Sequence, residues 1–327
     1  MKSSSPIIIL AGIACLLPAA LPAQAAPHMI SIAVGSADGN PQQVAAVVLG
    51  HEIGARSQNR LAVDVRVSEV LGSENAVLAA TRSWAVDITV VSGAVVGPVV
   101  PEFGVFDVPF LFRDSSHIKV VSEGAIGDAI ATKFKDKGLV LLAIGEQGVR
   151  NLTNSKHPIR APADLHGLKI RVMPNDVYAA TFRALGADVI PMEFPLVYSA
   201  LKEGRIDGQE NPLVSIVNNH LQEVQKYLTL TAHFTSPLAL VMNRDSYESL
   251  DAADQAAVRY AARQAAEASR RTASDSNAKI LAQLKSEGME VMETFDRQAF
   301  IDAVKPLEPE FEKRFGKDLL AAIRATR

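Results

Sequence analysis

Short runs of β-branched and other apolar residues alternate with helical patterns along the chain, and this alternation limits most strongly what the chain can fold into. The runs at 29–34, 61–67, 85–91 and 139–144 each have the length of one strand. Helices are expected between the first three runs, from Pro41 to about Ser57 and over about 73–83, with Pro41 suited to a first helical turn. Strands that alternate with helices pack in layers, so the sequence predicts an α/β fold.

A second α/β block is expected to begin near Gly148. Its predicted strands are 168–173, 188–190 and 237–242, and its predicted helices are 175–185, 195–203 and about 213–225. The strand at 237–242 is expected to return to the first block. The order of elements therefore predicts two α/β domains joined by crossing segments.

One alanine-rich helical pattern runs from Asp251 to about Ser286. Asp251 is suited to cap its first turn, and Gly288 is suited to end it. At about 1.5 Å per residue this helix would exceed about 50 Å, which is longer than one small domain. We expect it to contact both domains, with an ordinary surface helix with frayed ends as the alternative.

The first 25 residues have the pattern of a signal peptide. Lys2 supplies a positive charge, residues 7–21 are apolar and interrupted by Pro18, and 23–25 read Ala-Gln-Ala. Cleavage after Ala25 predicts an exported, periplasmic protein without cysteine. The alternatives are a buried N-terminal helix and a lipid-anchored Cys15.

Composition excludes several classes of protein and site. The 33 basic residues face 36 acidic ones, whereas an electrostatic nucleic-acid binder needs a basic surplus. The single cysteine excludes a disulfide framework and a cysteine-rich metal site. No H-E-x-x-H, G-x-S-x-G, G-x-G-x-x-G or P-loop pattern occurs, and the histidines do not cluster. We therefore expect no catalysis, no cofactor and no metal.

Two arginines stand where a buried positive charge would be useful. Arg171 lies within the predicted strand Leu168–Met173, and Arg150 follows another apolar strand. A guanidinium beside a cleft suits a planar carboxylate because it donates two parallel hydrogen bonds. An arginine paired with a protein acid, or exposed to solvent, is the alternative for each.

Ordered motifs along the mature chain resemble the solute-binding proteins of TRAP transporters, the DctP-like extracytoplasmic receptors. Their main elements are G-V-R-N-L-T-N at 148–154, P-A-D-L-H-G-L-K-I-R-V at 162–172, P-M-x-F at 191–194 and G-R-I-D-G-Q-E-N-P at 204–212. Further matches are F-D-V-P-F-L at 106–111 and K-Y-L-T-L-T-x-H at 226–233. The resemblance covers essentially the whole mature chain.

This resemblance implies a periplasmic-binding-protein fold whose two domains close over a ligand in the cleft between them. It places the ligand-carboxylate salt bridge on Arg171, an assisting arginine at Arg150, a ligand-contacting amide at Asn211 and an aromatic wall at Phe194. The chain departs from the family pattern at Leu196, where an acid is usual, and at Ala85, where a glycine is common.

The far end of the ligand is expected to meet the first domain. Candidate residues lie in the loop Gly35–Asn40, which contains Ser36, and at Glu74, Ser92 and Gly93, because α/β folds bind ligands at strand ends. A plain turn residue is the alternative at each position.

Together these observations predict a receptor that binds a small carboxylate, such as a C4-dicarboxylate or a sugar acid. It is expected to act as a monomer and to deliver the ligand to the small and large membrane subunits of a TRAP transporter. The expected domains are 26–148 with about 237–276, and 149–236 with about 277–327. An exported lyase or hydrolase acting on an organic acid is the alternative, and a role in presenting the ligand to a chemosensory protein also remains open.

Overall fold

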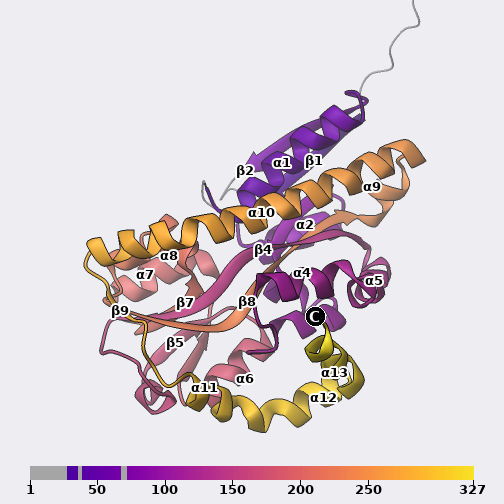
Figure 1. Ribbon diagram of the computed structural model, residues 1–327. Coiled ribbons are helices and arrows are strands. Elements are labelled where there is room, and N and C mark those ends of the chain that lie inside the picture. Colours follow the sequence, from indigo (N-terminus) through magenta and orange to yellow (C-terminus); the bar gives the residue numbers. More distant parts are fainter. Residues whose placement is uncertain (1–27, 36–38, 68–71) are drawn as a thin grey trace, which may run out of the picture.

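One mixed β-sheet forms the centre of the computed structural model, which describes residues 28–35, 39–67 and 72–327 (Figure 1). The predicted signal peptide and Ser36 lie outside these residues. The strands are β1 (His28–Val34), β2 (Leu61–Val67), β3 (Ile88–Ser92), β4 (Leu139–Asn154), β5 (Lys169–Val172), β6 (Asp188–Pro191), β7 (Gly208–Pro212), β8 (Tyr227–Asn243) and β9 (Glu290–Met292). They hydrogen-bond in the order β2-β1-β3-β8-β4-β7-β5-β6, and β9 pairs with β8.

Helices pack around this sheet, so the α/β prediction is confirmed. They are α1 (Pro41–Arg56), α2 (Glu74–Arg82), α3 (Gly93–Val96), α4 (Ser115–Glu123), α5 (Ala125–Thr132), α6 (Asp176–Ala184), α7 (Val197–Lys202), α8 (Leu213–Asn218), α9 (Arg244–Glu248), α10 (Ala252–Ser286), α11 (Arg297–Val304), α12 (Glu308–Phe315) and α13 (Lys317–Ala325). None of the helices in these described ranges is both long and apolar enough to cross a bilayer.

The first lobe comprises β1, β2 and β3 with α1 and α2. Its three strands are parallel, and side-chain caps fix where its two helices begin. The Asn40 carboxamide oxygen accepts from the Gln42 N–H at 3.0 Å before α1, and Ser73 caps α2. These caps satisfy backbone N–H groups that have no partner within a helix.

The second lobe comprises β5, β6 and β7 with α6, α7 and α8. β5 pairs in parallel with both β6 and β7. The Asn175 side chain caps α6 through the N–H groups of Val177 and Tyr178. The helix expected at about 213–225 ends at Asn218 and is followed by a short 3-10 turn, Leu221–Glu223.

Two long antiparallel strands, β4 and β8, run through both lobes. The sequence predicted only 139–144 and 237–242 as strands, which are the most apolar parts of each. Register shifts interrupt the β4–β8 ladder between Leu141 and Ala143, between Glu146 and Gly148, and between Arg150 and Leu152. Bulges bend a strand without ending it, which is why glycine and polar residues here do not mark a loop.

The 35-residue helix α10 lies across the long strands (Figure 1) and contacts α1 in the first lobe and α8 in the second. Its alanines at 261, 262 and 265 share an apolar core with β1 and β3, whereas Ile280 and Leu284 pack with residues of α7 and α8. At about 1.5 Å per residue it is about 52 Å long. The prediction of one helix touching both lobes is confirmed.

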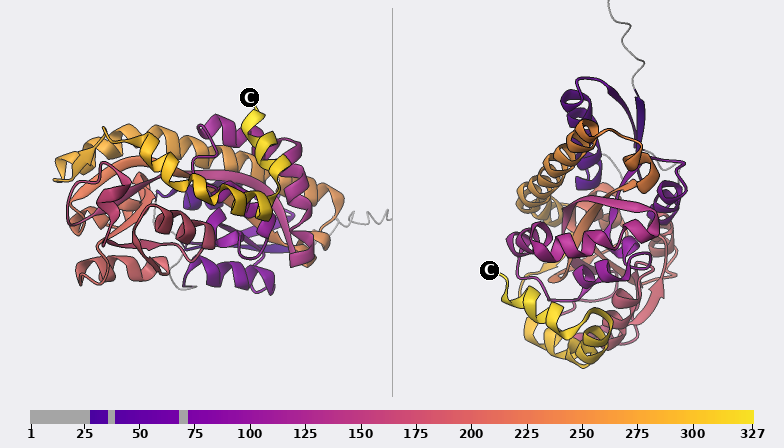
Figure 2. Two further views of the ribbon diagram at one scale, coloured as in Figure 1. Left: turned by 90° about the horizontal axis from the view of Figure 1, so that it is seen from below. Right: turned by 90° about the vertical axis from the view of Figure 1, so that its right-hand side faces the viewer.

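The C-terminal helices follow a less expected course. α11 contacts α6, whereas α12 packs against the 3-10 segment η2 (Pro101–Asp107), and the His117 ring bonds the Ile323 carbonyl of α13 at 2.9 Å. Figure 2 shows this last segment, in yellow, along one side of the molecule. The chain end therefore lies beside residues 101–117, although the sequence assigned 277–327 to the second domain. The domain boundaries remain a prediction.

Candidate ligand-binding site

A cavity of about 720 Å³ lies where strand ends from both lobes meet. Gly35 follows β1 and Ser92 ends β3 in the first lobe, while Met173 follows β5 and Asn211 lies near the end of β7 in the second. Parallel strands bring their carboxyl ends to one edge, so the topology itself gathers these residues. The volume is in the usual range for a small-molecule site.

Arg171, the third residue of β5, supplies a buried charge to the cavity wall. Its side chain is 1% exposed, and its Nε donates to the Met192 carbonyl at 2.8 Å. Nη1 and Nη2 are buried without a hydrogen-bond partner among the described residues. Lys169, two residues before Arg171 in β5, is exposed. Burial lowers the pKa of the Arg171 guanidinium to about 10, and Glu210 and more distant acids counter this only in part.

Arg150 also lines the cavity, but its charge is compensated within the protein. Its Nε lies 2.5 Å from Glu210 Oε2 and its Nη2 lies 2.8 Å from Glu210 Oε1, and both side chains are buried. Burial alone would lower the pKa of Arg150, but the Glu210 carboxylate raises it above its ordinary value. The site therefore contains one paired and one unpaired guanidinium.

Asn211 is positioned by this ion pair. Its carboxamide oxygen accepts from Arg150 Nη2 at 3.0 Å, and its Nδ2 donates to Gln209 Oε1. Asn211 faces Asn151 across the β4–β7 ladder. An amide held at both ends in this way presents a fixed group to the cavity.

Phe194 forms an apolar wall beside Arg171. It begins the 3-10 turn η5 (Phe194–Leu196), and the centre of its ring lies 5.6 Å from Arg171 Cζ. Leu196, where the family usually has an acid, is 53% exposed and does not line the cavity. The substitution at Leu196 therefore leaves the described cavity wall unchanged.

The first lobe contributes an anchored carboxylate, Glu74, at the first position of α2. Its Oε1 accepts from the Ser92 N–H and the Ser92 hydroxyl, each at 3.0 Å, and from Gln42 Nε2. All three partners donate, so they suit an ionised carboxylate. The amino end of a helix also favours negative charge.

Polar contacts connect the two lobes around the cavity. Gln147 of β4 donates to Asn40 Oδ1 at 3.2 Å in the first lobe and to Ser215 Oγ at 3.1 Å in the second. Asn75 of α2 donates to Glu193 Oε1 at 2.7 Å. The described arrangement is therefore one in which the lobes are in contact across the site.

Most of the predicted site residues meet at this cavity. Six of them line it: Arg171, Arg150, Asn211, Phe194, Glu74 and Ser92. Gly93 does not, because it begins α3 and packs against Pro237 and Phe103, where a Cβ would come within 2.9 Å of each. Sequence reasoning missed Gln42, Gln147, Ser215 and Tyr198. Gly35 and Asn40, the two ends of the predicted candidate loop, do line the cavity.

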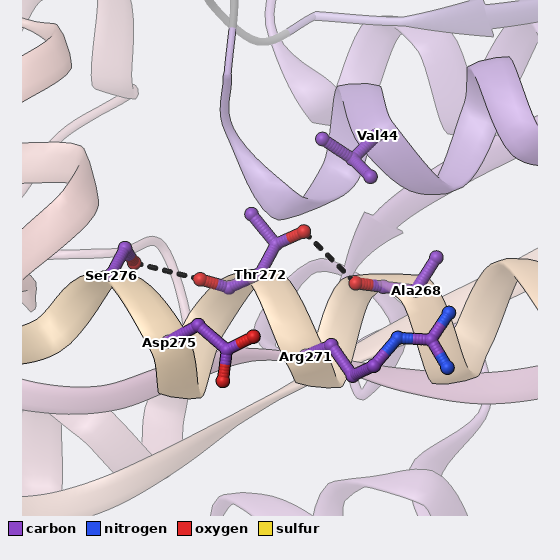
Figure 3. Close-up of a pocket in the computed structure, with 6 residues that line it drawn as sticks. All are labelled: Val44, Ala268, Arg271, Thr272, Asp275 and Ser276. Atoms are coloured by element: carbon purple, nitrogen blue, oxygen red, sulfur yellow. Dashed lines mark hydrogen bonds between the residues drawn. The ribbon is translucent and has the colours of Figure 1, made fainter.

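A second, open pocket lies on α10 beside Val44 of α1 (Figure 3). Two of its hydroxyls bond back to their own helix, from Thr272 to the Ala268 carbonyl at 2.9 Å and from Ser276 to the Thr272 carbonyl at 2.7 Å. It has no buried unpaired donor like those of Arg171. Residues 28–35, 39–67 and 72–327 contain no group of three His, Cys, Asp or Glu side chains that could hold a metal ion.

Comparison with known proteins shows that the chain matches a protein family. Residues 32–314 match the model of bacterial extracellular solute-binding protein family 7, DctP. The 2,3-diketo-L-gulonate-binding periplasmic protein YiaO of Escherichia coli is 32% identical over 326 residues, which are 99% of this chain and 98% of that protein. A solute-binding protein of Verminephrobacter eiseniae is 38% identical over 301 residues, covering 92% of this chain and 90% of that one.

The fold is similar to solved receptor structures. A TRAP periplasmic solute-binding protein from Polaromonas sp. JS666, bound to D-erythronate, aligns with a TM-score of 0.89 and 36% identity. The alignment covers 92% of this chain and 99% of that one. The two-lobed arrangement is thus shared over nearly the full described length.

Proposed function

Since the chain belongs to family 7 of the bacterial extracellular solute-binding proteins, we propose that it is the extracytoplasmic receptor of a TRAP-type transporter. In this proposal it binds a small organic acid reversibly and delivers it to the membrane subunits. The relatives described above are named for binding, and none of those names is that of an enzyme, which supports a receptor over the exported lyase or hydrolase.

The observation that carries the proposal is the unpaired guanidinium end of Arg171. A buried charge without a partner is costly, and a ligand carboxylate would satisfy both free Nη groups through two parallel hydrogen bonds. Arg150 is unsuited to be the primary carboxylate partner because Glu210 already occupies its fork. Its part in binding is to hold Asn211 in place.

The remaining lining residues fit a small polar acid. Phe194 covers one side of the guanidinium, which excludes water and strengthens the ion pair. Glu74 and Ser92 supply polar groups from the opposite lobe. A ligand gripped by both lobes would favour their closed arrangement over an open one, as population shift requires. Scattering measurements should then show a smaller radius of gyration with ligand than without.

The cellular setting follows from the same family. We infer that residues 1–25 are removed at Ala25 on export and that the mature receptor works in the periplasm as a monomer. Its expected partners are the small and large subunits of the transporter. Mass spectrometry of the exported protein tests the cleavage site, because retention of Lys2 or a lipid on Cys15 would contradict it.

Calorimetry with a panel of organic acids tests the proposal. We expect stoichiometric, reversible binding without turnover, and an Arg171→Met variant that folds but loses affinity. Removing one partner of a buried charge pair costs about 2–5 kcal/mol. This corresponds to a loss of roughly thirty- to several-thousand-fold. Arg205→Met is the matched control, since Arg205 pairs with Glu203 on the surface of the same lobe. Binding of Arg171→Met within about threefold of wild type would contradict the assignment.

A further inference from the structure

The two lobes contribute side chains of opposite charge to the cavity wall. The second lobe contributes the unpaired cation Arg171, whereas the first lobe contributes the carboxylate of Glu74. The two interact electrostatically, since Glu74 is among the acids that counter the lowering of the Arg171 pKa. A ligand held between them therefore meets a cation at one end and an anion at the other.

Glu74 is fixed in place as an acceptor. Its described hydrogen bonds come from Ser92 and Gln42 and all end on Oε1. A ligand hydroxyl can therefore donate to Oε2. A ligand carboxylate there would instead place two carboxylates side by side, and like charges at close range destabilise binding.

The described wall offers no second unpaired arginine or lysine. Arg150 is neutralised by Glu210. His220 also lines the cavity, but its side chain is 69% exposed and its Nδ1 lies 3.5 Å from Glu223 Oε1. Residues 36–38 and 68–71 read Ser-Ala-Asp and Ser-Glu-Val-Leu and contain no basic residue. A second ligand carboxylate would thus lose its hydration without gaining a cation.

We propose that this site selects acids with a single carboxylate and a hydroxylated far end, and that Glu74 is the residue that rejects a second carboxylate. The inference rests on the proposed receptor function and narrows its ligand class from organic acids in general to polyhydroxy monocarboxylates. Asn40, Gln147 and Ser215 line the same cavity and add amide and hydroxyl groups that suit further ligand hydroxyls.

The test compares two four-carbon acids that differ only at the far end. D-Erythronate ends in a hydroxymethyl group, and meso-tartrate carries a second carboxylate in its place. Calorimetry on the wild type should show erythronate binding at least about tenfold tighter, which is about 1.4 kcal/mol. Threonate and the tartrate of matching configuration give the same comparison for the other diastereomer.

The Glu74→Gln variant then assigns the preference to one side chain. It should bind tartrate more tightly and erythronate less tightly, and so reduce the ratio of affinities at least about fivefold. Glu203→Gln is the matched control, because Glu203 is also a carboxylate but pairs with Arg205 on the surface, is 58% exposed and does not line the cavity. We expect that control to leave the ratio within about twofold of wild type.

The outcomes separate this inference from the proposed function. If the tartrates bind as tightly as the matching monocarboxylates or more tightly, and this binding depends on Arg171, the inference is overturned and the proposed function stands. The same holds if folded Glu74→Gln shows the affinity ratio of the wild type. Should Glu74→Gln fail to fold, the wild-type ratios still decide, because a preference for the dicarboxylate contradicts the proposal. If no acid of the panel binds the wild type, the proposed function fails and the inference fails with it.

Discussion

Replacing Arg171 by methionine should stabilise the ligand-free protein while it removes ligand binding. The guanidinium is buried, its pKa is lowered from 12.5 to about 10, and its two Nη groups have no described partner. At neutral pH the folded state must keep the guanidinium charged despite its lowered pKa, which destabilises the fold by about 3 kcal/mol. Methionine removes this cost and fills much of the same space.

Two losses work against this gain. The Nε bond to the Met192 carbonyl disappears, and leaving that carbonyl unsatisfied costs about 1–3 kcal/mol. The contact with the Phe194 ring adds about 0.5 kcal/mol. The burial effect of about 3 kcal/mol exceeds the middle of their summed range, so we expect Arg171→Met to raise the free energy of unfolding by up to about 1 kcal/mol.

Urea unfolding without ligand measures this directly, and Arg150→Met is the contrasting variant. Removing Arg150 leaves the buried Glu210 carboxylate without its cation, which should lower stability by about 3–5 kcal/mol. Replacing the two buried arginines by methionine is thus predicted to change the free energy of unfolding in opposite directions. If Arg171→Met loses stability to the same extent as Arg150→Met, then the Arg171 charge is paired in the free protein and the reasoning is refuted.

Two further predictions concern the contact between the lobes and the pH dependence of stability. Asn75→Ala removes the 2.7 Å hydrogen bond to Glu193, which makes the closed arrangement of the lobes less populated. We expect ligand binding to weaken about threefold to tenfold. An unchanged Kd would show that the contact does not stabilise closure. Burial raises the pKa of the Asp107 carboxyl from 3.8 to about 7. Between these two values the folded protein keeps a proton on Asp107 that the unfolded chain has released. Stability should therefore fall as pH rises from about 4 to about 7, by at most about 4 kcal/mol, and Asp107→Asn should remove this slope in urea unfolding; an equal slope in variant and wild type would contradict it.

Local signals in the sequence predicted much of the fold. Pro41, Ser73, Asn175 and Asp251 mark helix starts that the structure places within a residue, because capping depends on immediate neighbours. The long helix over both lobes followed from its length alone.

The long strands could not be predicted in the same way. The bulge between Glu146 and Gly148 allows β4 to continue past a glycine. The first part of β8 is rich in threonine, yet its residues 227–229 pair with β4 on one side and with β9 on the other. Such strands are set by pairing with distant segments, not by their own composition.

The site shows the same division between local and long-range information. Motif resemblance pointed to Arg171 and Arg150 together, but only the ladder between β4 and β7 brings Glu210 onto Arg150 and leaves Arg171 unpaired. Gln147 was missed because its contacts with Asn40 and Ser215 join residues that are 107 and 68 positions away. Gly93 was predicted at the cavity from its place after a strand, but it packs against Phe103.

The central claim is that Arg171 holds the ligand carboxylate, and a crystal structure of the receptor with a bound acid from the calorimetric panel tests it most directly. The account predicts both carboxylate oxygens within about 3 Å of Nη1 and Nη2 of Arg171, with the Arg150–Glu210 pair intact. A carboxylate bound to Arg150 after displacement of Glu210, or seated more than about 4 Å from Arg171, would contradict it.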